Sequence, residues 1–275
     1  MLEDVVTPRG PYRLALVARR PRWEAPLPSG EAVAWQLPDG RVVVRAPDED
    51  GLLRARFMLA LDDDTGPFHR RYARDPLLGP AARALVGYRP LRTATVAHAV
   101  LRAVCGQLIE SRRARAIERA ILRVLGQRVA TRDALACVAP LDLRRAGLAQ
   151  HRASCLTRLA RTIELERLRE LEPAAVDARL LREHGIGPWS VGVVATEGLG
   201  RYDRGLVGDL GLMKLAAALW GRWPEAEETA ALLAPYGEWQ GLAGDVLMLG
   251  WGRGLVRGAD ADRGRATRVR ARRAA

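Results

Sequence analysis

The hydrophobic pattern after Leu91 restricts the fold more than any other feature of the chain. From Leu91 to Gly250 the sequence is rich in Ala and Leu, and its apolar residues recur at the three- and four-residue spacing of helices that bury one face. Strand-like alternation is essentially absent from this part of the chain. The spacing therefore predicts a helical region over residues 86–255.

The same pattern divides this region into separate helices. Residues 93–126 are long enough for one helix or a helix pair, and Gly, Pro and polar clusters interrupt the remainder. The further helices that we expect cover residues 132–138, 141–146, 152–168, 174–183, 190–198, 209–220, 225–233 and 241–250.

The beginning of the chain has a different pattern. The strands that it predicts cover residues 12–20, 31–37 and 41–47. The last two flank Pro38-Asp39-Gly40, which is a turn signal for a β-hairpin, and residues 49–61 carry a helical apolar stripe. We therefore expect an α+β domain with an antiparallel sheet over residues 1–85, in a chain that is mainly α-helical as a whole.

The charge of the chain indicates the kind of partner it binds. Its 275 residues carry a formal net charge of +12, which favours a polyanion. Arg supplies almost all of the positive charge and Lys214 is the single lysine; because GC-rich genomes also favour Arg, the Arg excess is not itself evidence of function. Residues 256–275 are basic and poor in large apolar residues, which predicts a disordered tail, either a solvated appendage or a loose phosphate-binding segment.

Other classes of protein are disfavoured by what the sequence lacks. No apolar run approaches the length that crosses a bilayer, and the first residues lack the pattern of a signal peptide, so we expect a cytoplasmic protein without a membrane partner. Three cysteines are too few and too scattered for a disulfide framework or a four-ligand cluster. No zinc spacing or Gly-rich nucleotide loop stands out, so we expect neither a metal nor an organic cofactor.

A tight turn separates two of the expected helices at Gly185-Ile186-Gly187-Pro188. The glycines permit a left-handed backbone and close approach, Pro188 suits the first turn of a helix, and Ile186 would fill the apolar gap between the helices. The N–H groups around Gly187 and Trp189 would then be free at the positive end of a helix, an arrangement that binds phosphate without reading sequence. An ordinary corner between two helices is the alternative.

These segments together resemble those of a known family. "GIGPWSVGVV" is similar to the hairpin of the helix-hairpin-helix DNA glycosylases, and Asp209 in "GLVGDLGLMK" follows it by about one helix and a loop, where that superfamily carries its catalytic Asp. "LDDDTGPFH", "RDPLLGP", "AVCGQLIES" and "YGEWQGLAGDVLMLGW" also occur in the order of the bacterial 3-methyladenine DNA glycosylase II type. The resemblance covers nearly the whole chain and implies two helical lobes, with the hairpin at residues 185–189 and an active-site cleft between the lobes.

The resemblance implies hydrolysis of the bond between a damaged base and its sugar. The transition state is similar to an oxocarbenium ion, which the Asp209 carboxylate would stabilise while it orients the attacking water. A plain helix N-cap is the alternative role for Asp209, and the two roles are compatible. Bifunctional relatives attack the sugar with a Lys at the position of Trp189, so the resemblance implies a monofunctional enzyme; Lys214 lies more than one helical turn beyond Asp209 and would point elsewhere.

The resemblance also assigns a base pocket and a wedge. Trp189 and Trp239 would stack on the flipped base beside an aliphatic wall at Leu210, although core packing is the alternative for either Trp. Gln107 and Leu108 would enter the gap that the flipped base leaves in the duplex. The alternative places Leu108 in the core and Gln107 at the surface.

The remaining expectations concern phosphate and partners. Gly185, Gly187, Trp189 and Lys214 would bind phosphate, and the resemblance admits a monovalent cation held by hairpin carbonyls. The Arg run at positions 112, 113, 115 and 119 would either track phosphates or form a solvated helix face. We expect a monomer that acts on double-stranded DNA containing damaged bases. The rival interpretations are a non-catalytic DNA-binding protein that keeps the hairpin as a phosphate clamp, and a bifunctional glycosylase/lyase.

Overall fold

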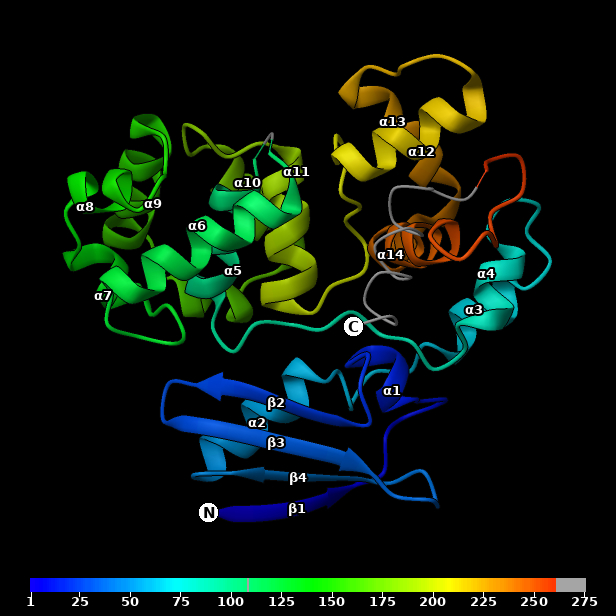
Figure 1. Cartoon of the computed structure of the whole chain (residues 1–275), viewed down its shortest axis with the longest axis horizontal. Coiled ribbons are helices and arrows are strands. Elements are labelled where there is room, and N and C mark those ends of the chain that lie inside the picture. Colours follow the sequence, from blue (N-terminus) through cyan, green and yellow to red (C-terminus); the bar gives the residue numbers. More distant parts are fainter. Residues whose placement is uncertain (108, 261–275) are drawn as a thin grey trace, which may run out of the picture.

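Three hydrophobic cores organise the chain into a sheet domain and two helical lobes (Figure 1). The computed structural model describes residues 1–107 and 109–260. The antiparallel sheet has the order β1-β4-β3-β2, and its strands are β1 (Leu2–Val6), β2 (Arg22–Leu27), β3 (Gly30–Gln36) and β4 (Val42–Ala46). Helix α2 (Glu49–Met58) packs against β3 and β4, with the Asp48 side chain capping its first turn through the Gly51 N–H at 2.7 Å.

The strands expected at residues 31–37 and 41–47 are confirmed as β3 and β4. The strand expected at residues 12–20 is wrong, because this segment forms a short helix, α1 (Leu14–Val17). Its two buried residues are spaced three apart, and the Gln36 side chain accepts the free N–H of Leu14 at 2.9 Å. Strands β1 and β2 were not expected from the sequence.

The first helical lobe forms from the middle of the chain and appears in green in Figure 1. Of the two alternatives for residues 93–126, one helix or a pair, the structure has the pair: α5 (Val96–Gly106) and α6 (Ser111–Val124). The other elements of this lobe are α7 (Arg132–Cys137), α8 (Pro140–Arg145), α9 (Gln150–Thr162), the 3₁₀ helix η1 (Leu165–Glu170), α10 (Pro173–Leu181), α11 (Pro188–Val193) and the π-helical segment η2 (Val194–Gly198).

The second lobe combines helices from two distant parts of the sequence. Its C-terminal elements are α12 (Leu210–Trp220), η3 (Ala226–Glu228), α13 (Thr229–Leu233), η4 (Ala234–Trp239) and α14 (Gln240–Trp251). Helices α3 (Gly66–Tyr72) and α4 (Gly79–Ala84) share their core, although they fall within the predicted domain 1–85. Val256, the first residue of the predicted tail, is also buried in this core, whereas residues 261–275 of that tail lie outside the described residues.

Two buried arginines connect the sheet domain with the two helical lobes. Arg92 pairs with Asp63 in the loop after α2, and it donates to the Gly200 carbonyl at 3.0 Å and to the Tyr202 hydroxyl at 3.3 Å. Arg89 is fully buried and donates to backbone carbonyls of Ala60, Arg9 and Pro11. A buried guanidinium is stable only when its donors are paired, so these contacts fix how the lobes sit on the sheet domain.

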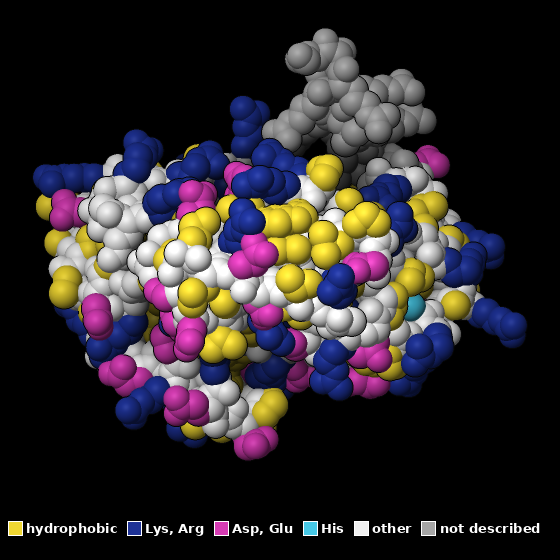
Figure 2. Space-filling view, turned by 90° about the horizontal axis from the view of Figure 1, so that it is seen from below, with side chains coloured by type: hydrophobic (Ala, Val, Ile, Leu, Met, Phe, Trp, Pro, Cys, Tyr) yellow, Lys and Arg dark blue, Asp and Glu magenta, His cyan; other side chains and the backbone are white. Residues whose placement is uncertain are grey.

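Charges of both signs are intermingled on the face that carries the sheet. Figure 2 shows this face, where acidic and basic side chains alternate rather than gather by sign. Surface ion pairs such as Arg22–Glu24 at 2.9 Å and Arg56–Asp62 at 2.7 Å neutralise much of the charge on this face. The excess positive charge of the chain is therefore not concentrated on the sheet domain. No helix in the described part of the chain is both long and apolar enough to cross a membrane.

We predict that Arg92→Ala destabilises the protein strongly. The change leaves the Asp63 carboxylate, whose side chain is only 19% exposed, without its cation, so the free energy of unfolding should fall by about 3–5 kcal/mol in urea denaturation. The matched control is Arg128→Ala, since Arg128 pairs with Glu31 at the surface and is 67% exposed; it should change the free energy by less than about 1 kcal/mol. Equal effects of the two variants would contradict this role for Arg92.

Candidate functional site

The predicted hairpin lies between α10 and α11 in the first lobe. Gly185 has a left-handed backbone (φ +91°), and a Cβ there would approach the Cys155 sulfur to 3.2 Å, so glycine is required for both reasons. Ile186 is 9% exposed and belongs to the core of the first lobe, which confirms that it fills the gap between the helices. Gly187 is the N-cap of α11, and a Cβ there would meet nothing within 4 Å, so this side of the turn is open.

Side chains from neighbouring helices hold the hairpin from behind. Gln107, at the end of α5, donates to the Gly185 carbonyl at 2.7 Å and to the Ser190 hydroxyl at 3.0 Å. Arg158 donates to the His184 carbonyl at 2.6 Å. Each of these two carbonyl oxygens accepts one hydrogen bond, and cation binding at the hairpin stays a prediction.

The wedge expected at Gln107 and Leu108 is only partly described. Gln107 is directed to the hairpin, so entering a duplex would require it to give up two hydrogen bonds. Leu108 lies outside the described residues. The wedge role of both residues stays a prediction.

Asp209 joins the hairpin to the second lobe. One carboxylate oxygen accepts from the N–H groups of Gly211 at 2.8 Å and Leu212 at 3.2 Å, so Asp209 is the N-cap of α12. The other oxygen accepts from the indole N–H of Trp189 at 3.1 Å. The preceding Gly208 has φ +80°, which turns the chain so that the carboxylate faces α11. Asp209 is half-buried rather than sealed in the interior.

Trp189 is the second member of this pair. Its indole lies so close to Gly106, the last residue of α5, that a Cβ at Gly106 would approach the ring to 2.6 Å. The ring is therefore fixed between α5 and Asp209, and it also packs against the core of the first lobe. Trp189 carries no amine, so it cannot form a Schiff base with a sugar.

The other predicted pocket and phosphate residues are spread around this pair. Leu210 is 37% exposed at the start of α12, directly beside Asp209. Trp239 stacks on Tyr202 with centroids 5.8 Å apart and also contacts Phe68, so much of its surface belongs to the core of the second lobe. Lys214 is exposed on α12.

A cavity of about 450 Å³ lies where the two lobes meet the sheet domain. We call it the junction cavity, and its lining includes Arg19, Trp23, Val193, Glu197, Leu206 and Asp245. Trp189, Val193 and Glu197 follow one another at four-residue spacing, so one face of α11 and η2 leads from Asp209 towards the cavity. Its volume lies within the range of about 300–1,000 Å³ that is usual for small-molecule pockets.

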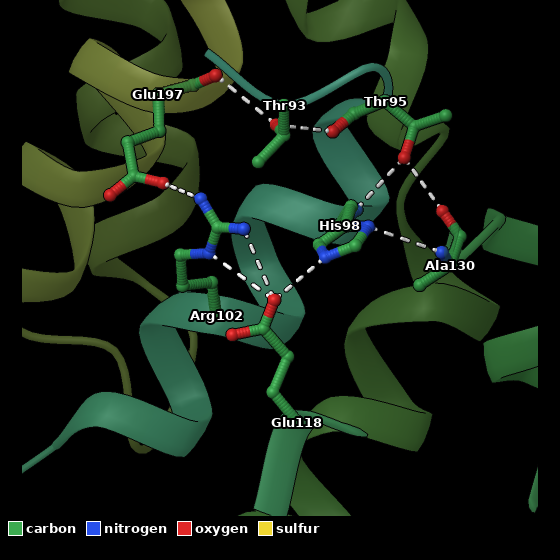
Figure 3. Close-up of polar contacts among 7 residues, drawn as sticks. All are labelled: Thr93, Thr95, His98, Arg102, Glu118, Ala130 and Glu197. Atoms are coloured by element: carbon green, nitrogen blue, oxygen red, sulfur yellow. Dashed lines mark hydrogen bonds and ion pairs between the residues drawn. The ribbon is translucent and has the colours of Figure 1, made fainter. Parts of the chain in front are cut away.

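A buried polar cluster forms one wall of the junction cavity (Figure 3). Glu118 accepts from His98 at 2.9 Å and from Arg102 at 3.1 Å, and Arg102 also pairs with Glu197. Burial alone would raise the pKa of Glu118, but the hydrogen bonds and charges of His98 and Arg102 outweigh it and lower the pKa from 4.5 to about 2. The cluster thus holds Glu197 in a neutralised pair at the cavity wall.

Sequence reasoning missed Asp245 as a residue of this region. Asp245 lines the junction cavity from α14, and it is the single charged residue in this apolar helix. Burial, together with the charges of Glu197 and Asp209, raises the pKa of Asp245 from 3.8 to about 7. The sequence did carry one signal for Asp245, because it is an isolated acidic residue in an otherwise apolar helical segment.

Comparison with known proteins identifies the fold. The chain is 24% identical over 224 residues to a DNA-3-methyladenine glycosylase of Bacillus subtilis. The matched region covers 75% of this chain and 74% of that protein. Its structure is similar to that of a 3-methyladenine DNA glycosylase from Archaeoglobus fulgidus, with a TM-score of 0.73 at 18% identity, over 92% of this chain and 98% of the other. The chain therefore has the fold of the helix-hairpin-helix DNA glycosylases, as the resemblance implied.

Other solved structures with this fold have different activities in their own descriptions. A Clostridium acetobutylicum 8-oxoguanine glycosylase/lyase in complex with double-stranded DNA matches with a TM-score of 0.72 at 15% identity, over 92% of this chain and 98% of that one. A 3-methyladenine DNA glycosylase of Schizosaccharomyces pombe in complex with abasic DNA matches with a TM-score of 0.57 at 18% identity, over 67% and 96%. No protein-family model matches the chain.

We predict that the buried cluster makes the protein sensitive to acid through Glu118. A carboxyl whose folded pKa is depressed stabilises the protein above its unfolded pKa of 4.5, and this stabilisation is lost as the pH falls towards 2. Glu118→Gln should therefore lower the free energy of unfolding by about 3 kcal/mol at pH 6 but by only about 1.5 kcal/mol at pH 3. Urea denaturation at both pH values measures the difference, and a difference that does not change with pH would contradict the prediction.

Proposed function

We propose that this chain is a monofunctional DNA glycosylase that flips an alkylated purine out of duplex DNA and hydrolyses its N-glycosidic bond. The observation that carries the proposal is that the Asp209 carboxylate accepts hydrogen bonds both from its own helix and from Trp189 of the hairpin helix. These hydrogen bonds keep one half-buried carboxylate beside the open turn at Gly187, where a DNA backbone would be bound.

The proposed chemistry needs one negative charge at a fixed place. As the bond to the base breaks, positive charge develops on the sugar, and a preorganised carboxylate stabilises it without having to reorient. The oxygen that faces Trp189 would also orient the water that attacks the sugar. Trp189 and the two capping N–H groups hold the Asp209 side chain in one position, which is what such a role requires.

Binding of DNA is supported by unpaired positive charge next to the hairpin. Helix α6 begins a few residues after Gln107 and has no acidic residue in its first turn. Its exposed arginines, none of which forms an ion pair with another described residue, are Arg112, Arg113, Arg115 and Arg119. Cations near a helix N-terminus are unfavourable by themselves, so an anionic partner would relieve this arrangement. Phosphates of duplex DNA supply such a partner, and we expect the protein to act on it as a monomer.

The substrate class rests on the relatives and on Trp189. The relatives named above from Bacillus subtilis, Archaeoglobus fulgidus and Schizosaccharomyces pombe are 3-methyladenine glycosylases, which favours an alkylated purine over 8-oxoguanine. A lyase reaction needs an amine that attacks the sugar, and neither Trp189 nor Asp209 supplies one. Simple hydrolysis that leaves an abasic site is therefore the proposed outcome.

We predict that Asp209→Asn abolishes most base release without unfolding the protein. Asn also caps helices, so α12 should persist, while the loss of the charge should slow release by on the order of 10²–10⁴-fold. The measurement is the release of free bases from methylated duplex DNA, with circular dichroism to check folding. Asp133→Asn is the control, since this side chain is 85% exposed on α7 and should have no effect. Unchanged release in Asp209→Asn would exclude the proposed mechanism.

We predict that borohydride traps no covalent complex between the protein and DNA containing an abasic site. The single lysine, Lys214, is exposed one turn and more beyond Asp209, so no amine meets the sugar. A known glycosylase/lyase serves as the positive control on a denaturing gel. An adduct that forms with the wild type and disappears in Lys214→Arg would replace hydrolysis with a lyase mechanism.

A further inference from the structure

One acidic side chain that lines the junction cavity lacks a partner among the described residues. Arg92 pairs with Asp63, and Arg102 pairs with Glu118 and Glu197. Asp245, by contrast, forms no hydrogen bond or ion pair with any side chain or backbone group in the part of the chain that the structure describes. Asp245 is half-buried at the wall of this cavity, and a carboxylate without donors from the protein suits a ligand that brings N–H groups.

Asp245 is close to the proposed reaction centre. The negative charge of Asp209 contributes to the raised pKa of Asp245, so the two carboxylates interact through space. Leu206 lines the junction cavity, and its carbonyl accepts the N–H of Asp209 at 2.9 Å. If the base of a nucleotide whose sugar lies at Asp209 extends past Leu206, its far edge enters the junction cavity.

Arg19 is the opposite charge at the same cavity. It lies exposed just after α1, and its positive charge opposes the rise in the pKa of Asp245. Its backbone is left-handed (φ 59°), an uncommon and strained conformation for a residue other than glycine. Within residues 1–107 and 109–260, no acceptor binds its guanidinium, which leaves its donors available at the rim of the cavity.

We propose that Asp245 and Arg19 read the Watson–Crick edge of a flipped guanine, so that alkylated guanine is preferred over alkylated adenine. This inference rests on the proposed function. It states which of the alkylated purines the enzyme prefers. Guanine presents two adjacent N–H donors, at N1 and N2, which suit the two oxygens of one carboxylate. The adjoining O6 is an acceptor, which suits a guanidinium donor.

Adenine fits the same pair of side chains less well. Its edge presents the N6 amino donor beside the N1 acceptor, so one carboxylate oxygen would meet a lone pair instead of an N–H. An unpaired or repelled polar group in a desolvated pocket is what gives recognition its strongest discrimination. Alkylation also leaves a positive charge on either purine, so the charge of Asp245 favours both, whereas the hydrogen-bond pattern separates them.

The test uses duplex DNA methylated with dimethyl sulfate, which contains both 7-methylguanine and 3-methyladenine. Chromatography of the released bases gives their ratio from a single reaction. For Asp245→Asn, which keeps the size but replaces one acceptor by a donor, the ratio of 7-methylguanine to 3-methyladenine should fall about tenfold or more. Arg19→Ala should lower the ratio by a smaller factor. The control Glu238→Gln, at an exposed surface pair with Arg71, should leave it unchanged.

A second measurement separates this inference from the proposed function. Binding of free 7-methylguanine is followed by tryptophan fluorescence, because Trp23 lines the junction cavity. Loss of binding in Asp245→Asn supports the inference even if the wild type releases no base. Release of both bases with an unchanged ratio in Asp245→Asn overturns the inference and leaves the proposed function standing. Absence of both release and binding in the wild type overturns both.

Asp245→Asn is expected to fold, so the result does not depend on loss of structure. A carboxyl whose folded pKa is raised destabilises the protein as the pH rises above its unfolded pKa, because the folded state disfavours the charged form. Removing this charge should leave the melting temperature at pH 8 unchanged or higher. A lower melting temperature would mean that Asp245 has a structural partner, which would overturn its assignment as a reader of the base.

Discussion

The proposed site depends on the two hydrogen-bonded contacts of Asp209. Its carboxylate is the N-cap of a helix in the second lobe and the acceptor of an indole N–H from the first lobe. The two lobes have separate cores, so the position of this carboxylate relative to the hairpin is set by how the lobes pack. That packing depends on Arg92 and Arg89, which bind Asp63 and backbone carbonyls from the sheet domain and the segments next to it. The geometry of the candidate site is therefore a property of the whole chain.

Local signals predicted much of the fold, and long-range packing was the part they missed. The helical spacing after Leu91 and the turn at Pro38-Asp39-Gly40 both reflect local backbone preferences, which one sequence carries. Strand β2 was missed because it contains Pro26, a residue that suits only an edge strand, and β2 is an edge. The segment at α1 alternates like a strand but buries residues at helical spacing. The packing of α3 and α4 with α12–α14 has no local signal, because residues far apart in sequence create it.

The candidate site also has parts that local sequence signals predicted and parts that only long-range packing creates. The hairpin and the cap at Asp209 are local motifs, and the resemblance supplied their relation to each other. The contact between Trp189 and Asp209 joins the two lobes, and the contact of Gln107 with the hairpin joins segments of the first lobe that are far apart in the chain, so neither had a sequence signal. The pocket role of Trp239 stays a prediction, and the structure adds that Trp239 stacks on Tyr202, which itself contacts Arg92. Asp245 had a signal, a lone charge in an apolar helix, but only the three-dimensional arrangement gives that charge a cavity.

The buried contacts of Arg92 limit how far the lobes can move if a duplex enters between them. One guanidinium contacts Asp63 beside the sheet domain, Gly200 at the exit of the first lobe and Tyr202 at the entrance of the second. A hinge motion at this point would have to break several buried polar contacts at once, so the relative position of the lobes is fixed before a partner arrives. Under the proposed function, the elastic work of docking would then fall on the nucleic acid, whose stiffness varies with sequence and is weakened where stacking is already disturbed. A rigid protein of this kind would respond to how easily the duplex deforms before it contacts a single base.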